Sequence, residues 1–243
     1  MATLDALRSR IKRMVGHEIP HKATQLTAFC NEAVDNIAAG IRMPNGDISA
    51  PLPDLQDTDT VETATDAAYK SLPDDYMRGL YLVADSSGNT IASPRGGDYY
   101  AFKLFMKHHA IEKDLSEAGS VHHVVVKGSN LYYQGIPTAS TALTVWFYRT
   151  PTAMSKTSDT PDGIPDHLQS RLICHHACKE ILGELLHRTK DENDLKVLLL
   201  GKSYHKKEFI EAMLDLVDFI GIDAEPIYYG SDHGSYVDAG ICD

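Results

Sequence analysis

Apolar residues recur at helical spacing near both ends of this chain and at strand spacing in its middle, and this order constrains the fold more than any other feature. Near the start, Leu4, Leu7, Ile11 and Met14 follow the spacing of one helical face, and Gly16 comes next as a stop signal. A second apolar stripe predicts a helix over residues 24–40. Two short antiparallel helices are therefore expected at the start of the chain.

The residues after 159 carry the second helical region. Pro165 suits the first turn of a helix that is predicted to continue to about residue 188. Another helix is expected over residues 191–220, and Gly201 is the point where it could break. Its predicted apolar stripe consists of Leu195, Leu198, Leu199, Phe209, Met213, Leu216 and Ile220.

The middle of the chain has strand and turn signals. Residues 42–60 are rich in proline and aspartate and are predicted to be a loop, with a turn at Asn45 and Gly46. A hairpin is expected over residues 80–92, a helix over 100–115, and a three-stranded meander over 121–149. In the last strand of the meander, alternating apolar residues predict one buried face, formed by Leu143, Val145 and Phe147.

These signals predict an α+β fold. Residues 1–41 and 159–220 are expected to form a helical bundle domain, because two amphipathic regions at the chain ends can bury their stripes against each other. Residues 42–158 are expected to form an inserted antiparallel β lobe with one helix. Residues 221–243 are rich in glycine, aspartate and tyrosine without a period, and are predicted to be an extended tail.

The composition limits the classes of partner. The formal net charge of −11 disfavours tight binding to the phosphate backbone of nucleic acid, which needs clustered lysine and arginine. The first residues lack the apolar run of a signal peptide, and no stretch is long and apolar enough to predict a membrane span. The four cysteines have no framework spacing and are expected to be reduced thiols of a protein made in a cytoplasm.

The densest group of chemically versatile side chains is the segment that begins at Cys174 and ends at Cys178, with two histidines between them. Its residue types would suit zinc. At about 100° per residue, however, the two cysteines lie on the same helical arc as Ile181, and His176 lies on the opposite arc with Gln169. The preferred interpretation is that both cysteines pack in a helix–helix seam and that His176 is solvated.

Other motifs give no catalytic prediction. The histidine pairs at 108–109 and 122–123 have no orienting partner that spacing can name, so they are interpreted as surface or interface residues. Gly201, Lys202 and Ser203 resemble the end of a phosphate-binding loop, but Lys196 stands where that motif needs glycine. The acidic residues of 54–59 lack the turn glycine of a calcium loop. No catalytic, cofactor-binding or metal-binding residue is predicted, and the chain is not expected to be an enzyme.

Three segments together resemble the head-to-tail adaptor family of tailed bacteriophages, also called head-completion or neck proteins. Residues 4–12 and 26–34 are similar to the family's opening pair of amphipathic helices. Residues 130–137 are similar to its tight hairpin. Residues 143–151 are similar to the strand that follows, which ends in an aromatic residue, a tyrosine, an arginine, any one residue and a proline. Residues 159–168 resemble the family's entry into its carboxy-terminal helices. The chain departs from small adaptors in a longer segment over residues 43–119.

The resemblance implies a structural virion protein at the neck, assembled in the cytoplasm of the host bacterium. Such proteins dock as a ring, usually twelve-fold, on the portal, extend the DNA channel and connect the filled head to the tail. The implied partners are the portal protein, neighbouring adaptor subunits, and a tail or nozzle protein, with genomic DNA only passing through; no membrane and no cofactor are implied. The tail would then supply the partner-contact residues Ile227, Tyr228, Tyr229, Tyr236 and Val237.

Three alternatives stay open at this point. Another phage neck or tail component, such as a head-closure protein, would differ in its position in the particle. An enzyme of unrecognised class, for example a metal-dependent one, would show turnover or bound metal. A DNA-binding packaging factor would form a salt-dependent complex with DNA, which the net charge of −11 opposes.

Overall fold

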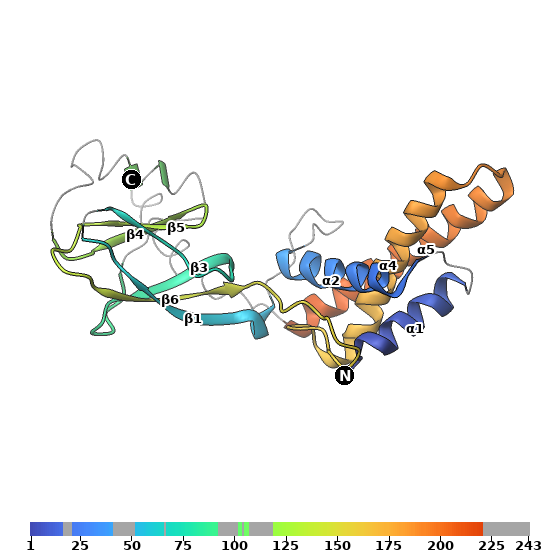
Figure 1. Ribbon diagram of the computed structural model, residues 1–243, viewed down its shortest axis with the longest axis horizontal. Coiled ribbons are helices and arrows are strands. Elements are labelled where there is room, and N and C mark those ends of the chain that lie inside the picture. The colour runs from blue at the N-terminus through green and yellow to red at the C-terminus, as the bar shows by residue number, and fades with distance from the viewer. Residues whose placement is uncertain are drawn as a thin grey trace, which may run out of the picture. The chain divides into compact units, whose positions relative to one another are not determined.

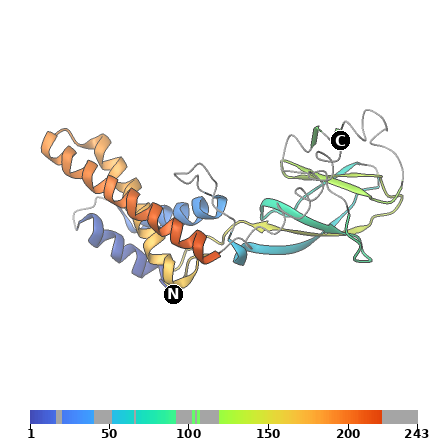
Figure 2. The same ribbon diagram turned by 180° about the vertical axis from the view of Figure 1, so that it is seen from behind.

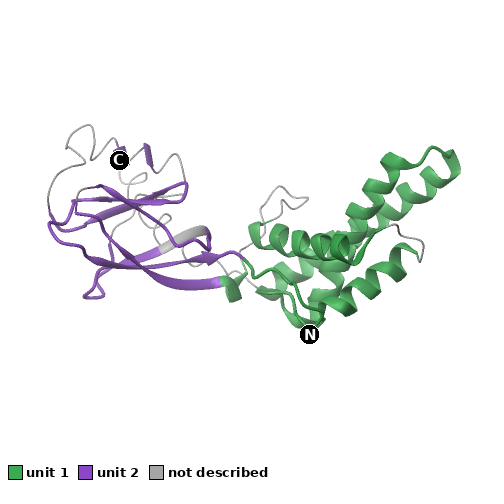
Figure 3. Cartoon of the chain, in the orientation of Figure 1, with its two compact units in different colours: residues 1–55, 151–224 green, residues 56–150, 225–243 purple. Residues whose placement is uncertain are grey.

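A computed structural model describes residues 1–16, 21–40, 52–65, 67–91, 102–103, 105–106 and 119–220 of the 243-residue chain. The chain divides into two compact units (Figure 3), residues 1–55 with 151–224 and residues 56–150 with 225–243. We call them the helical unit and the β unit. The predicted α+β class is confirmed, because the first contains helices and the second antiparallel strands (Figure 1). The finer division predicted at 41/42 and 158/159 stays a prediction.

The two opening helices are α1 (Leu4–Val15) and α2 (Ala23–Ala39), which confirms the predicted pair. The Thr3 side chain caps α1 by accepting from the amide of Ala6 at 3.4 Å. Gly16 then ends the helix with a φ of 110°, which strongly favours glycine. Of the predicted stripe of α1, Leu4, Leu7 and Ile11 are buried and Met14 is half-buried.

The two closing helices are α4 (Asp166–Arg188) and α5 (Glu192–Ile220), and they form an antiparallel hairpin (Figure 2). The helix α5 runs through Gly201 without a break. A β-carbon at that position would lie 3.2 Å from Cδ1 of Leu182, so the glycine allows close packing against α4. The short glycine-lysine-serine segment is therefore part of a helix, as predicted.

The helix α4 is the centre of the helical unit, because α1, α2 and α5 all pack against it. Its buried residues occur all around its circumference and not along one stripe. Burial of each large apolar side chain here contributes about 1.5–3 kcal/mol to folding. This central position decides the environment of every side chain on α4.

The segment between the β unit and α4 is fixed to the opening helices. The backbone amide of Leu4 donates to the carbonyl of Asp159 at 2.8 Å. The side chain of Asn31 on α2 both donates to and accepts from the backbone of Met154, each at 3.0 Å. Gly163 has a φ of 74° and lies against the buried Leu55 of the short 3-10 helix η1 (Pro53–Leu55).

The β unit contains two three-stranded antiparallel sheets. One has the order β1 (Gln56–Glu62), β6 (Ala142–Arg149), β3 (Tyr76–Ala84). The other has the order β2 (Tyr69–Ser71), β5 (Asn130–Gln134), β4 (His123–Lys127). The predicted turns after residues 85 and 127 are present. In the hairpin predicted over residues 80–92, the second strand is reduced to one bridge between Thr90 and Ala84.

Two strand predictions were wrong. The meander is not formed, because β6 pairs with β1 and β3 and not with β5. The predicted loop over 42–60 contains the start of β1, which pairs along its whole length, from Gln56 to Glu62, with residues 142–148 of β6. The aspartates of β1 are the reason that the sequence predicted a loop here. In the structure β1 is an edge strand, where charged residues are common, and the aspartate side chains are exposed or half-buried.

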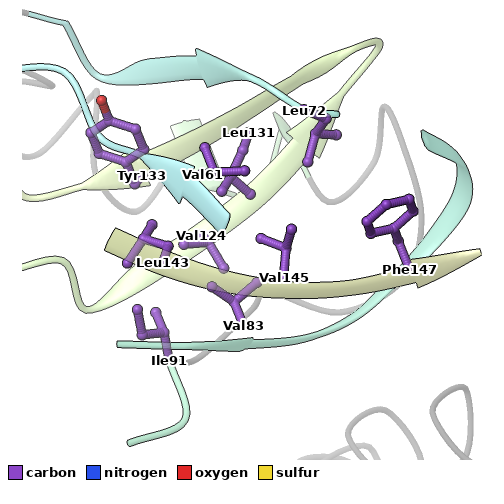
Figure 4. Close-up of a cluster of buried hydrophobic side chains, with 10 residues drawn as sticks. All are labelled: Val61, Leu72, Val83, Ile91, Val124, Leu131, Tyr133, Leu143, Val145 and Phe147. Carbon is purple, nitrogen blue, oxygen red and sulfur yellow. The ribbon is translucent and has the colours of Figure 1, made fainter. Parts of the chain in front are cut away.

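The core of the β unit lies between the two sheets. Figure 4 shows side chains from both sheets pointing toward one another, and the predicted alternation of Leu143, Val145 and Phe147 faces this core. Val125 on the other face of β4 packs with Phe105 in a second, smaller cluster. The sandwich-like arrangement therefore buries both faces of β4.

Some predictions lie outside the described residues. The turn at Asn45 and Gly46, most of the helix over 100–115, the pair at 108–109 and the tail over 221–243 belong to this group. Of the predicted helix, Phe102, Lys103, Phe105 and Met106 are described and are helical.

Candidate assembly surface

The predicted partner-contact residues Ile227, Tyr228, Tyr229, Tyr236 and Val237 lie outside the described residues, so they stay a prediction. The remaining histidine pair is found at the start of β4, where His122 is exposed and His123 is half-buried.

The cysteines of α4 lie in a helix–helix seam, as the helical arc predicted. Cys174, Cys178 and Cys30 of α2 are fully buried and not disulfide-bonded, and Sγ of Cys174 lies 3.9 Å from the carbonyl oxygen of Leu7. Burial raises the pKa of Cys30 to about 12 and that of Cys174 to about 11. These thiols stay protonated, so they are poor nucleophiles and poor metal ligands. The described residues contain no group of three side chains placed to hold a metal ion.

The interpretation of His176 as a solvated residue was wrong. Its side chain is buried, with Nε2 accepting from the amide of Asn36 at 3.3 Å and its ring edge on to Phe209 of α5. Gln169 on the same arc is buried as well. The reason is the central position of α4: α2 and α5 together cover His176, and the backbone amide of Ala2 donates to Oε1 of Gln169 at 2.8 Å. Burial lowers the pKa of His176 to about 4.

A buried pair of histidines joins the two helices of the hairpin. Nδ1 of His175 lies 3.0 Å from Nδ1 of His205, so one ring donates its N–H to the other. Burial lowers the pKa of both, to about 4 for His175. Spacing within each helix did not predict this pair. Both histidines lie 15 positions from residue 190, where the hairpin turns (190 − 175 and 205 − 190). Equal distance from the turn of an antiparallel hairpin brings two residues side by side, and this spacing could have predicted the pair.

These three buried histidines predict a pH-dependent stability. The folded chain keeps His175, His176 and His205 neutral, whereas the unfolded chain protonates them near the ordinary pKa of 6.5. The unfolded state therefore binds more protons between pH 6.5 and about 4, and the free energy of unfolding falls as the pH falls through that range. We expect a loss of about 2 kcal/mol or more between pH 7.5 and pH 5.

Urea denaturation at both pH values measures this loss. The double variant His175→Asn with His205→Asn keeps polar side chains at both positions, but these do not titrate. Its free energy of unfolding should therefore fall less between the two pH values. Equal stability at the two pH values in the parent chain would contradict the assigned burial.

The exposed apolar side chains concentrate on α5. Of the eight large apolar side chains that are exposed among the described residues, six lie on this helix. The predicted stripe was wrong in its first half, because Leu199 is 55% exposed and Leu195 and Leu198 are only half-buried. Figures 1 and 2 show the reason: the end of the hairpin near residue 190 projects away from α1 and α2, so α4 alone covers it.

Among the described residues, the interior thus holds protonated thiols and neutral imidazoles, and α5 carries exposed apolar side chains of the kind that suit assembly. A family model described as SU10 adaptor protein matches residues 2–225. The chain belongs to this adaptor family. No curated protein matches it.

Membership makes the chain a phage adaptor, a structural protein of the virion that interacts with portal and tail components. The expected phage adaptor resemblance and the expected structural role are confirmed at this level. Adaptors of this family are not known as enzymes. No described helix of the adaptor is long and apolar enough to span a membrane.

Proposed function

We propose that this adaptor docks as a ring on the portal of the DNA-filled head, extends the DNA channel and connects the head to the tail. The observation that carries the proposal is the family match over residues 2–225, which spans both the helical unit and the β unit. The partners are the portal, neighbouring adaptor subunits in a twelve-fold ring, and a tail or nozzle protein. Its position is the neck of the virion.

The charge of the adaptor supports a channel through which DNA passes without being held. With a net charge of −11, its surface repels phosphate overall, and any contact with DNA stays weak. A ring of such subunits lets DNA pass through its channel without binding it tightly. DNA is therefore a transient neighbour and not a ligand in this proposal.

The tail is the proposed contact to the portal or to an adjacent subunit. Residues 221–243 include Tyr228, Tyr229 and Tyr236, which provide large contact area with few rotatable bonds, and the apolar Ile227 and Val237. An extended segment of this composition suits addition to a groove or strand of another protein.

Mass measurement of the full chain, alone and mixed with purified portal rings, tests the proposal. We expect a monomer or weak oligomer alone and a ring of adaptor subunits on the portal, because binding to the template offsets the cost of ordering the tail. A stable ring without portal would contradict templated assembly. Absence of any complex with portal would contradict the function.

A further inference from the structure

The helix α1 is the most basic element in the described part of the chain. Its cations are Arg8, Arg10, Lys12 and Arg13, and its one carboxylate is Asp5, so its net charge is +3 (4 − 1). No other helix or strand that the structure describes has a net charge above +1. The rest of the chain has a net charge of −14 (−11 − 3). Positive charge is therefore concentrated on one short helix of an acidic protein.

The four cations lie along the side of α1 that faces away from its buried apolar stripe. At 100° per residue, Arg8 and Lys12 form one row, about 40° apart, and Arg10 and Arg13 form a second row, about 60° apart. The two rows flank Ser9, which lies opposite the buried stripe. Arg8 is half-buried and the other three cations are exposed. We call this surface the α1 basic face.

No carboxylate neutralises the α1 basic face. None of its cations forms an ion pair with any residue that the structure describes, Asp5 included. The guanidinium of Arg8 instead donates to Oγ1 of Thr27 on α2, at 2.9 Å from Nε, and that of Arg10 donates to Oγ of Ser170 on α4 at 2.9 Å. These neutral hydroxyls leave both charges intact. They also hold the guanidinium groups in place, which lowers the entropy cost of binding an anion.

The density of positive charge on α1 indicates the kind of anion that fits it. The four cations fall within five residue steps, or about 7.5 Å along the helix axis. Duplex DNA carries one negative charge about every 1.7 Å, so several phosphates lie within that length. The acidic tail over residues 221–243 has five carboxylate side chains, an average of one per roughly 15 Å if fully extended. A dense group of cations therefore matches a phosphate backbone better than it matches this polypeptide.

We infer that the α1 basic face contacts the phosphate backbone of duplex DNA as the DNA passes through the adaptor ring. The inference rests on the proposed function, which brings DNA close to every subunit. The guanidinium groups of α1 suit phosphate, because each can donate two parallel hydrogen bonds to it. The remaining net charge of −14 repels DNA, so the contact is weak and sensitive to salt. Contacts to phosphate alone read no base sequence, which suits a channel that every part of a genome crosses.

Binding of a short labelled duplex to the full-length adaptor at rising salt concentration tests the inference. The variant Lys12→Gln with Arg13→Gln removes two exposed cations whose side chains make no hydrogen bond or ion pair among the described residues. We expect this α1 variant to bind about tenfold or more weakly at low salt. The slope of log affinity against log salt should become shallower by about 2, because each lost phosphate contact removes about 0.9 from it.

The control variant Lys156→Gln with Lys190→Gln makes the same change in net charge at exposed positions of the helical unit outside α1. Its affinity for DNA and its salt slope should equal those of the parent. Thermal melting of both variants shows that each keeps its fold, so that a loss of binding reports the α1 basic face itself.

A parent chain that binds no DNA at low salt would overturn the inference. A control that loses as much affinity as the α1 variant would also overturn it, because the attraction would then be spread over the whole unit. An α1 variant that binds DNA normally but no longer forms a ring on the portal would assign the α1 basic face to a protein partner instead.

Portal binding separates this inference from the proposed function. If the parent forms a ring on the portal and the α1 variant binds DNA as the parent does, the DNA contact fails and the adaptor function stands. If the α1 variant loses DNA binding as expected but the parent does not bind the portal, the DNA contact stands and the docking function fails.

Discussion

Deletion of residues 222–243 is expected to abolish binding of the adaptor to portal-bearing heads while changing its melting temperature by less than about 2 °C. The buried side chains of α5 end at Leu216, so the described core does not extend to the deleted residues. The sequence of the tail, with its three tyrosines, suits contact with another protein. Loss of docking without loss of stability is the signature of a segment that serves assembly only.

Thermal melting and co-sedimentation with portal-bearing heads measure the two effects. A milder variant, in which Tyr228, Tyr229 and Tyr236 are all replaced by serine, keeps the length of the tail and should lose most of the binding. A fall of many degrees in the melting temperature would place the tail in the folded core. Normal binding of the truncated chain would place docking elsewhere, with α1 and α2 as the next surface to test.

Replacement of Gly163 by alanine is expected to lower the free energy of unfolding of the helical unit by about 2–4 kcal/mol. The new β-carbon would lie 2.7 Å from Cγ and 2.9 Å from Cδ2 of Leu55. Leu55 is fully buried, so its side chain has no free space into which it could rotate. The φ of 74° at this position adds the cost of a left-handed conformation to the cost of the clash.

Gly128→Ala supplies the control for the backbone contribution. Its φ is 60° and no atom lies within 4 Å of the added β-carbon, so we expect a cost of only about 1 kcal/mol. Denaturation of Gly163→Ala, of Leu55→Ala and of the variant that carries both changes forms a cycle that isolates the clash. The double variant should cost less than the sum of its two single changes. Additive costs would show that Leu55 does not restrain Gly163.

The sequence by itself determined the local elements and the family. The stripe of Leu4, Leu7 and Ile11 and the stop at Gly16 were sufficient for α1, because spacing along one helix reports which side chains share a face. The alternation of Leu143, Val145 and Phe147 was sufficient for the buried face of β6 for the same reason. Membership of the adaptor family is also a property of the sequence, since the match over residues 2–225 needs no coordinates.

Spacing could not determine what covers each face, because that depends on residues distant in the chain. It placed His176 in solvent, whereas α2 and α5 bury it. It placed Leu199 in the core, whereas nothing described covers that side of the hairpin end. It paired β6 with its predecessor in the chain, whereas the preferred partner was β1, a strand 92 positions from it at the Gln56–Tyr148 pair (148 − 56). Only the tertiary structure decided these points, since burial and strand pairing are set by contacts between elements and not by the pattern within one of them.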